Sequence, residues 1–321
     1  MSEITFPELA HKIQQHFEQQ TYAEGLSLAS EHFTRFPEEF PTLNYWRICL
    51  AARMEQFSLA NKFLETTLAS GIWFADFMLR QSPALAAIQG DPEFERLNQI
   101  SAQMRAADGG DVPMLVARPE NACAPGEEGC PAVIFLHSNM DTAQNNLQHW
   151  AHLSARDWLV AVPQSSQALW TGAYNWVDHE LTREEMDGHF QRLTSQYSLD
   201  EEKLIWGGFS MGAEMALTLV LNGDFPACGF VLLAPGGPKI DDLSQWGPLV
   251  DKAAGRSLRG VIWMGEEDHT IPQQNVRALA ERLNTGGIPT RLETFPRLGH
   301  AYPDEFESVA ARALDDILKG D

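Results

Sequence analysis

The sequence predicts an α/β protein in which a mostly parallel, doubly wound sheet is preceded by a small all-helical domain. Within the first hundred residues, apolar side chains recur at helical spacing, as at Phe57, Ala60 and Leu64, and β-rich runs are absent. Beyond about residue 112, short apolar runs alternate with helical segments. Continuous apolar strands separated by helices are typical of a parallel sheet buried on both faces. The chain has 321 residues, which is long enough for two such domains.

The helical domain is predicted over residues 1–105, and part of it carries a loose repeat. Tyr22 and Gly25 are followed 35 positions later by Phe57 and Ala60, so an aromatic and a small residue recur with the same spacing. A small residue lets two helices approach closely while the aromatic ring fills the gap beside it. The region over roughly residues 5–75 resembles a tetratricopeptide repeat. An unrelated helical bundle is the alternative, because only about two units are present and solenoids usually need three or more.

A polar, glycine-containing stretch at residues 106–111 interrupts the helical pattern and is interpreted as a linker. The second domain is then predicted over residues 112–321. Its apolar runs predict strands at 133–136, 159–162, 204–206, 230–233, 261–264 and 290–295. Helices are expected near 142–156, 181–196, 211–222 and 272–286. In such a sheet, ligands bind outside the carboxyl ends of the strands, so the residues that follow each run are candidates for the site.

Composition and charge exclude several classes of partner. Lys and Arg total 23 against 44 Asp and Glu, and the formal net charge of -21 opposes the phosphate contacts that dominate nucleic-acid binding. No apolar run approaches the roughly 18–20 residues of a membrane-spanning helix, and the first residues lack a basic start and an apolar signal core. We therefore expect no nucleic acid, no membrane span and a cytoplasmic location.

The four cysteines are too few for a disulfide framework, and we expect them to be reduced. Cys123 and Cys130 flank a turn-rich segment, so a bridge between them and two free thiols both remain open. No metal is expected. His149 and His152 share a predicted helix, but no third ligand accompanies them.

The strand at 204–206 is followed by Gly208-Phe209-Ser210-Met211-Gly212 and then by a helical segment. A Gly-x-Ser-x-Gly pattern is typical of a sharp turn between a strand and a helix. This turn strains the serine backbone and leaves no room for side chains at the two glycines. It presents the hydroxyl of Ser210 above the sheet, at the positive end of the helix. Ser210 is therefore the candidate nucleophile.

A serine hydroxyl needs an adjacent base, and the base needs a third group that fixes its tautomer. His300 follows the last predicted strand in a Gly-His loop, and Asp268 follows the strand at 261–264. Ser210, Asp268 and His300 occur in the chain order that accompanies this type of turn. Asp241 and Asp242 follow the preceding strand and are the alternative acids.

Residues from about 112 to 318 resemble the α/β-hydrolase family, in particular its branch of small carboxylesterases, acyl-protein thioesterases and phospholipases. The resemblance rests on Gly-Phe-Ser-Met-Gly around Ser210, on Gly265-Glu266-Glu267-Asp268 with Ile271-Pro272, and on Gly299-His300 with Pro303. It implies an α/β-hydrolase fold and an esterase-type activity that needs no cofactor.

An oxyanion hole needs two backbone N–H groups that point to where negative charge develops. The amide of Met211, directly after the nucleophile, is expected to supply one. By the resemblance, the amide of Asn139 supplies the other, because His137-Ser138-Asn139 stands where the family usually has His-Gly-x. Ser138 replaces the usual glycine and carries a Cβ, so Ser138 or Met140 is the alternative donor.

Met140, Trp170 and Trp176 are predicted to contact the substrate, with core packing as the alternative for the two tryptophans. The sequence thus predicts a serine hydrolase that cleaves a small-molecule carboxylic ester or thioester through an acyl-enzyme, and its acidic charge favours a neutral or cationic acyl substrate. One alternative is a peptidase or amidase with the same triad, and the other is a partner-binding protein that uses the hydrolase domain as a scaffold. The helical domain is expected to recruit a protein partner or to mediate self-association.

Overall fold

The computed structural model describes residues 4–109, 112–120, 123–126 and 128–319. The chain forms two compact units. One consists of Met1–Gly110 and Ala168–Thr171, and the other of Asp111–Gln167 and Gly172–Asp321. Of the stretch at 106–111 that the sequence predicts as a linker, residues 106 and 107 end a helix, whereas 110 and 111 lie outside the described residues.

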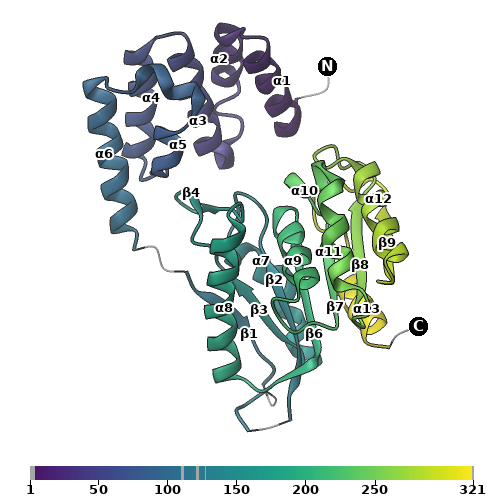
Figure 1. The fold of residues 1–321 in the computed structure, drawn as a ribbon. Coiled ribbons are helices and arrows are strands. Elements are labelled where there is room, and N and C mark those ends of the chain that lie inside the picture. Colours follow the sequence, from purple (N-terminus) through teal and green to yellow (C-terminus); the bar gives the residue numbers. More distant parts are fainter. Residues whose placement is uncertain (1–3, 110–111, 121–122, 127, 320–321) are drawn as a thin grey trace. The chain divides into compact units, whose positions relative to one another are not determined.

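The first unit is helical over its N-terminal part, as the sequence predicts (Figure 1). Its α-helices are α1 (Phe6–Glu18), α2 (Tyr22–Glu31), α3 (Phe40–Arg53), α4 (Phe57–Ala69), α5 (Asp76–Arg80) and α6 (Pro92–Ala107), with 3₁₀ turns at Pro37–Glu39 and Pro83–Ile88. The short strand β4 (Ala168–Trp170) belongs to this unit as well. The amide of Ala75 donates to the carbonyl of Leu169 at 2.7 Å, and the Phe74 ring packs against the Trp170 ring.

The small residues of the loose repeat lie where helices approach each other. A Cβ at Gly25 in α2 would lie 3.0 Å from the Cβ of His16 in α1 and 3.1 Å from a methyl group of Leu50 in α3. Ala60 in α4 is fully buried. The helical character of this region is confirmed, and its assignment as a tetratricopeptide repeat stays a prediction.

The second unit is built on a seven-stranded sheet with the order β1-β3-β2-β6-β7-β8-β9. Its strands are β1 (Met114–Ala117), β2 (Cys130–Leu136), β3 (Leu159–Pro163), β6 (Leu199–Phe209), β7 (Gly229–Leu233), β8 (Arg259–Gly265) and β9 (Thr290–Phe295). Every neighbouring pair is parallel except β1 and β3, which are antiparallel. The mostly parallel sheet is thus confirmed. The strand β1 was not predicted, although its four residues are all apolar; it is a short, half-buried edge strand. A further short strand, β5, spans Ala173–Tyr174.

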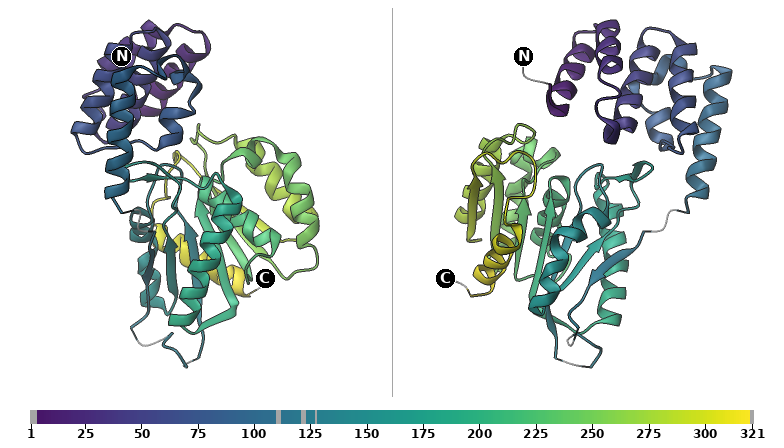
Figure 2. Two further views of the ribbon diagram at one scale, coloured as in Figure 1. Left: turned by 60° about the vertical axis from the view of Figure 1, so that its left-hand side comes forward. Right: turned by 180° about the vertical axis from the view of Figure 1, so that it is seen from behind.

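Helices cover both faces of this sheet (Figures 1 and 2). Helices α8 (His179–Gln196), α9 (Met211–Asn222), α11 (Trp246–Ala253) and α12 (Gln273–Thr285) lie on one face, and α7 (Ala143–Trp150) and α13 (Phe306–Lys319) lie on the other. The four-residue helix α10 spans Pro238–Asp241, and 3₁₀ turns span Ala151–Arg156 and Leu243–Gln245. Strands β2 and β6 are neighbours, and the connection from β2 to β3 runs along the sheet in the opposite direction to the connection from β6 to β7. Such a switch point opens a crevice at the carboxyl ends of the strands.

The structure corrects the expectation that all four cysteines are reduced. Cys123 and Cys130 form a disulfide with a Cα–Cα distance of 5.3 Å, whereas Cys49 and Cys228 are free. Both ends of the intervening loop are fixed to one residue at the start of β6. The amide of Ser198 donates to the carbonyl of Cys123, and the amide of Cys130 donates to the carbonyl of Ser198. The two sulfur atoms are thereby brought within bonding distance.

Within the described ranges, none of the helices combines the length and the apolar character that crossing a bilayer requires.

Candidate active site

Ser210 occupies a strained turn between β6 and α9. Its backbone has φ 54° and ψ -118°, which lies outside the regions that residues with a side chain usually adopt. Two hydrogen bonds hold it there: its amide donates to the carbonyl of Leu233 at 2.9 Å, and its carbonyl accepts from the amide of Gly236 at 3.1 Å. Neighbouring strand ends therefore maintain the strain, as is common at functional positions.

The two glycines of the motif are required by close backbone contacts. A Cβ at Gly208 would lie 2.2 Å from the carbonyl carbon of Gly212. A Cβ at Gly212 would lie 2.3 Å from the carbonyl oxygens of Leu136 and His137, at the end of β2. Helix α9 therefore begins directly against the loop that follows β2, which is the loop where the sequence analysis expects the oxyanion hole.

Asp268 and His300 are hydrogen-bonded, with 2.7 Å between Asp268 Oδ2 and His300 Nδ1. The Asp268 side chain is fully buried, and its Oδ1 accepts from the amides of Thr270 and Ile271 at 2.8 and 3.1 Å. Burial alone raises the pKa of Asp268, but the hydrogen bonds from His300 and the two amides outweigh it, and the net pKa is lowered. The carboxylate therefore stays charged and orients the imidazole through Nδ1.

The His300 ring lies beside the turn that carries Ser210. Its centroid is 4.8 Å from that of Phe209, the residue before the serine. Among the described residues, no hydrogen bond joins the Ser210 hydroxyl to the His300 ring. Contacts between nucleophile and base are often long in a free enzyme and shorten when substrate binds. Ser210, Asp268 and His300 follow the carboxyl ends of β6, β8 and β9, which belong to one edge of the sheet.

The alternative acids, Asp241 and Asp242, are both exposed. Asp242 is exposed and accepts from the amide and hydroxyl of Ser244 and from the side chain of Gln245, so it caps a 3₁₀ turn. Asp241 is exposed in the last turn of α10. Neither hydrogen-bonds to a histidine within the described part of the chain.

Around the expected oxyanion hole, the amides of Ser138, Asn139 and Met211 donate in none of the hydrogen bonds of the described residues, so Ser138 stays open as an alternative donor. Met211 is the first residue of α9, so its amide has no acceptor within the helix. The amide of Asn139 takes part in none of the backbone hydrogen bonds formed by the described residues. By contrast, the amide of Met140 donates to the carbonyl of Tyr174 at 2.8 Å. The left-handed residue of this turn is Met140, with φ 58°, and Ser138 adopts an ordinary conformation despite replacing a glycine.

His137 is a structural component of this loop that the sequence analysis did not identify. Its imidazole is fully buried, which lowers its pKa to about 4. Nδ1 is 2.8 Å from the carbonyl of Ser138, and Nε2 accepts from the amide of Ser165 at 3.2 Å. Since a carbonyl only accepts and an amide only donates, the ring is neutral and carries its proton on Nδ1. His137 thus ties the loop after β2 to the end of β3.

The side chains predicted to contact the substrate differ in exposure. Met140 is 46% exposed, and its contact with a substrate stays a prediction. Trp176 is 1% exposed and donates from Nε1 to the carbonyl of His137 at 2.9 Å. Trp170 is 7% exposed and packs against Phe74 within the helical unit. The burial of both tryptophans favours the packing alternative, and their contact with a substrate stays a prediction; Trp176 is hydrogen-bonded to the loop after β2.

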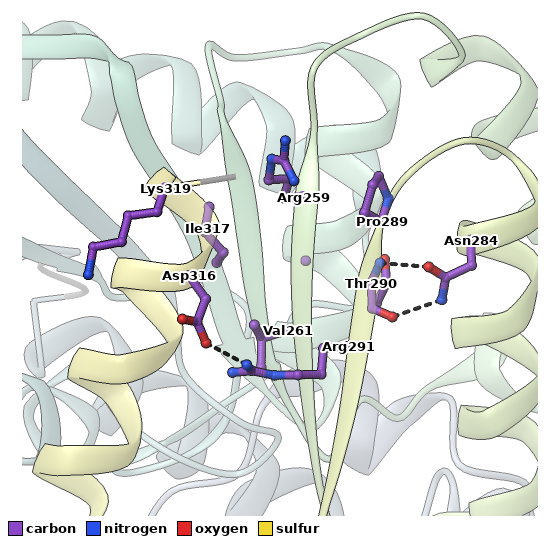
Figure 3. Close-up of a pocket in the computed structure, with 10 residues that line it drawn as sticks. Arg259, Val261, Asn284, Pro289, Thr290, Arg291, Asp316, Ile317 and Lys319 are labelled. Atoms are coloured by element: carbon purple, nitrogen blue, oxygen red, sulfur yellow. Dashed lines mark hydrogen bonds and ion pairs between the residues drawn. The ribbon is translucent and has the colours of Figure 1, made fainter. Parts of the chain in front are cut away.

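A cavity of about 410 Å³ in the same unit lies away from these residues. Figure 3 shows that Arg259, Thr290 and Arg291 line it together with Asp316, to which Arg291 is hydrogen-bonded. Arg259 and Thr290 begin β8 and β9, so the cavity lies at the amino ends of these strands. The candidate active site lies at their carboxyl ends.

In the part of the chain that the structure describes, no cluster of three or more His, Cys, Asp or Glu is arranged to hold a metal ion.

Comparisons with known proteins agree with this architecture. The chain is 28% identical over 142 residues to "Acyl-protein thioesterase 1" of Debaryomyces hansenii, a match that covers 43% of this chain and 55% of that protein. It is 30% identical over 143 residues to the protein of the same name from Gibberella zeae, covering 41% and 52%. The chain thus spans about half the length of the curated relatives it matches.

Solved structures show the same fold. An uncharacterized protein from Bacillus cereus aligns over 99% of this chain and 100% of its own, with a TM-score of 0.56 and 20% identity. Esterase PE8 aligns over 65% of this chain and 100% of its own, with a TM-score of 0.52 and 17% identity. The model of the family described as "Dienelactone hydrolase family" matches residues 153–316, about half of the chain. The chain therefore belongs to the dienelactone hydrolase family and has the α/β-hydrolase fold that its sequence predicts.

Proposed function

We propose that this chain hydrolyses a carboxylic ester or thioester through an acyl-enzyme, with Ser210 as nucleophile, His300 as base and Asp268 as the group that orients the base. The observation that carries the proposal is the hydrogen bond between His300 Nδ1 and the buried Asp268 carboxylate, next to a serine held in a strained strand-to-helix turn. This combination fixes the imidazole tautomer near a turn that carries a serine, and acyl transfer by a serine requires both features.

The same groups act in both halves of the proposed reaction, and His300 serves in each half first as base and then as acid. Because Asp268 engages Nδ1, the Nε2 atom of His300 is the one that removes the proton from the Ser210 hydroxyl as its oxygen attacks the acyl carbon. The oxyanion that forms accepts hydrogen bonds from the amides of Met211 and Asn139. When the tetrahedral intermediate collapses, Nε2–H protonates the leaving alcohol or thiol. Water then attacks the acyl-enzyme by the same route and releases the acid and the free serine.

The relatives favour acyl esters or thioesters as substrates, since the curated proteins that the chain resembles are named acyl-protein thioesterases. Met140 is the side chain we propose to contact the acyl group, because it is exposed beside the oxyanion loop and methionine adapts to varied apolar shapes.

We further propose that residues 112–321 are the catalytic domain and that the helical domain over 1–105 recruits a protein partner or mediates self-association. The cytoplasm is the proposed location.

A substrate panel tests this proposal. Purified protein is assayed with p-nitrophenyl esters of increasing acyl length, with acyl thioesters and with acyl anilides, and each rate is compared with that of Ser210→Ala. We expect turnover of esters or thioesters that falls by at least about 10³-fold in the variant. A protein that turns over anilides best would be a peptidase or amidase. A protein equally active with alanine at position 210 would overturn the proposal.

A further inference from the structure

The carboxylate of Asp141 is a hydrogen-bonding centre in the loop after β2. Its Oδ1 accepts from the amide of Thr142 and the side chain of Asn145, both at 2.8 Å. Its Oδ2 accepts from the hydroxyl of Ser138 at 3.1 Å and from the side chain of Asn146 at 2.7 Å. Two carboxylate oxygens offer about four acceptor positions, so these four donors saturate the group.

From Asp141 the hydrogen bonds continue to the loop that carries His300. The buried side chain of Asn146 donates to Asp141 from Nδ2 and accepts at Oδ1 from the hydroxyl of Tyr302 at 2.8 Å. Tyr302 lies two residues after His300. Segments 156 positions apart in the chain are therefore joined through a single asparagine.

The ring of Tyr302 is fixed independently of this hydrogen bond. It stacks on His149 with a centroid distance of 3.8 Å and meets the edge of Phe306 at 4.9 Å. It also contacts Phe209, at 5.4 Å, and that ring in turn packs against His300. Tyr302 can therefore anchor Asn146 and Asp141, because its own position is set by packing around the base.

At the other end, Asp141 fixes the residue that precedes the expected oxyanion donor. Ser138 stands where the family usually has glycine, and its hydroxyl donates to Asp141. On the other side of Asn139, the amide of Met140 is bound to Tyr174. The amide of Asn139 thus lies between two anchored residues, so a shift of Ser138 would change its direction.

We propose that Asp141 is a positioning residue that couples the oxyanion loop to the histidine loop through Ser138, Asn146 and Tyr302. The inference rests on the proposed function. Its consequence is that loss of either end of this path misaligns the Asn139 amide with the developing oxyanion. Because misplacement by about 1 Å can cost about 10²-fold in rate, the effect falls on turnover rather than on substrate binding.

A double-mutant cycle tests this coupling. Ser138→Ala and Tyr302→Phe each remove one hydroxyl from an end of the path, and kcat and KM are measured with a p-nitrophenyl ester for both variants and for the double variant. We expect each single change to lower kcat by about 5- to 30-fold, with KM within about twofold of the wild type. The double variant should lose clearly less than the product of the two single losses, as coupled positions do.

Tyr45→Phe is the matched control, because it deletes a part-buried tyrosine hydroxyl that donates to the carbonyl of Met78 in the helical unit. We expect Tyr45→Phe to leave kcat unchanged while lowering the melting temperature by about as much as Tyr302→Phe does. The coupling would be overturned if the single variants of Ser138 and Tyr302 kept the wild-type kcat. It would also be overturned if the loss of kcat in the double variant equalled the product of the two single losses. A wild-type protein without Ser210-dependent turnover would overturn the proposed function, and the inference with it.

Discussion

Replacement of Asp268 by asparagine perturbs the proposed triad at a single atom pair. In the variant, the amide oxygen can still accept from the amides of Thr270 and Ile271, which now bond to Oδ1 at 2.8 and 3.1 Å. The amide nitrogen then faces His300 Nδ1, which is 2.7 Å from Oδ2 in the wild type. Since that nitrogen donates, Nδ1 must accept, and the ring proton moves to Nε2.

An imidazole that carries its proton on Nε2 cannot remove a proton from the Ser210 hydroxyl. Substitution of this kind in a serine triad lowers kcat by about 10⁴-fold, which corresponds to about 5 kcal/mol of transition-state stabilisation. We therefore expect kcat of Asp268→Asn to fall by about 10³- to 10⁴-fold, measured with a p-nitrophenyl ester between pH 6 and 9. The side chain volume is unchanged, so the melting temperature should stay within a few degrees of the wild type.

Asp242→Asn is the control, because Asp242 is an exposed acid whose hydrogen bonds are to Ser244 and Gln245. Its kcat should stay within about twofold of the wild type. If Asp268→Asn retains more than about a tenth of the wild-type kcat, or if Asp242→Asn is the variant that loses turnover, the assignment of the acid is wrong.

Three further predictions concern stability, each measured by urea unfolding. Gly212→Ala places a Cβ 2.3 Å from two carbonyl oxygens, so we expect a loss of at least about 1–3 kcal/mol, and an unchanged midpoint would contradict the contact. Burial lowers the pKa of His137 to about 4, so below pH 6.5 the unfolded chain binds a proton that the folded chain does not. Between pH 7.5 and 5, the wild type should therefore lose about 2 kcal/mol more than His137→Gln, and an equal loss in both would refute this reasoning. Cys130→Ser removes the disulfide with Cys123, which closes a loop with a sequence separation of 7, and should cost about 2 kcal/mol through the entropy of the unfolded chain; no cost would argue against the disulfide.

The parts of the fold that the sequence predicted are those with a strong local signal. Strand β8 and the turn around Ser210 have such signals, because a buried parallel strand needs a continuous apolar run and the turn needs two glycines. The edge strand β1 is an apolar run of only four residues directly after the predicted linker, and the sequence analysis did not assign it as a strand. The chain order of Asp268 and His300 was enough to predict their pairing, because both follow strands at the same edge of the sheet.

Features that depend on contacts between distant segments were not predictable in this way. The burial of Trp176 depends on the carbonyl of His137, 39 positions earlier, and the same sequence is equally compatible with a cleft. The disulfide of Cys123 depends on Ser198, which holds both ends of its loop. The role inferred for Asp141 depends on Tyr302, and no spacing along the chain relates them.

The most direct test of the account is covalent labelling with a serine-directed fluorophosphonate, followed by peptide mapping by mass spectrometry. A hydroxyl activated by His300 and Asp268 should react stoichiometrically, and the modified peptide should contain Ser210. The variants Ser210→Ala and His300→Ala should remain unlabelled under the same conditions. Modification of another residue, or labelling that persists with alanine at position 210, would contradict the central claim that Ser210 is the activated nucleophile.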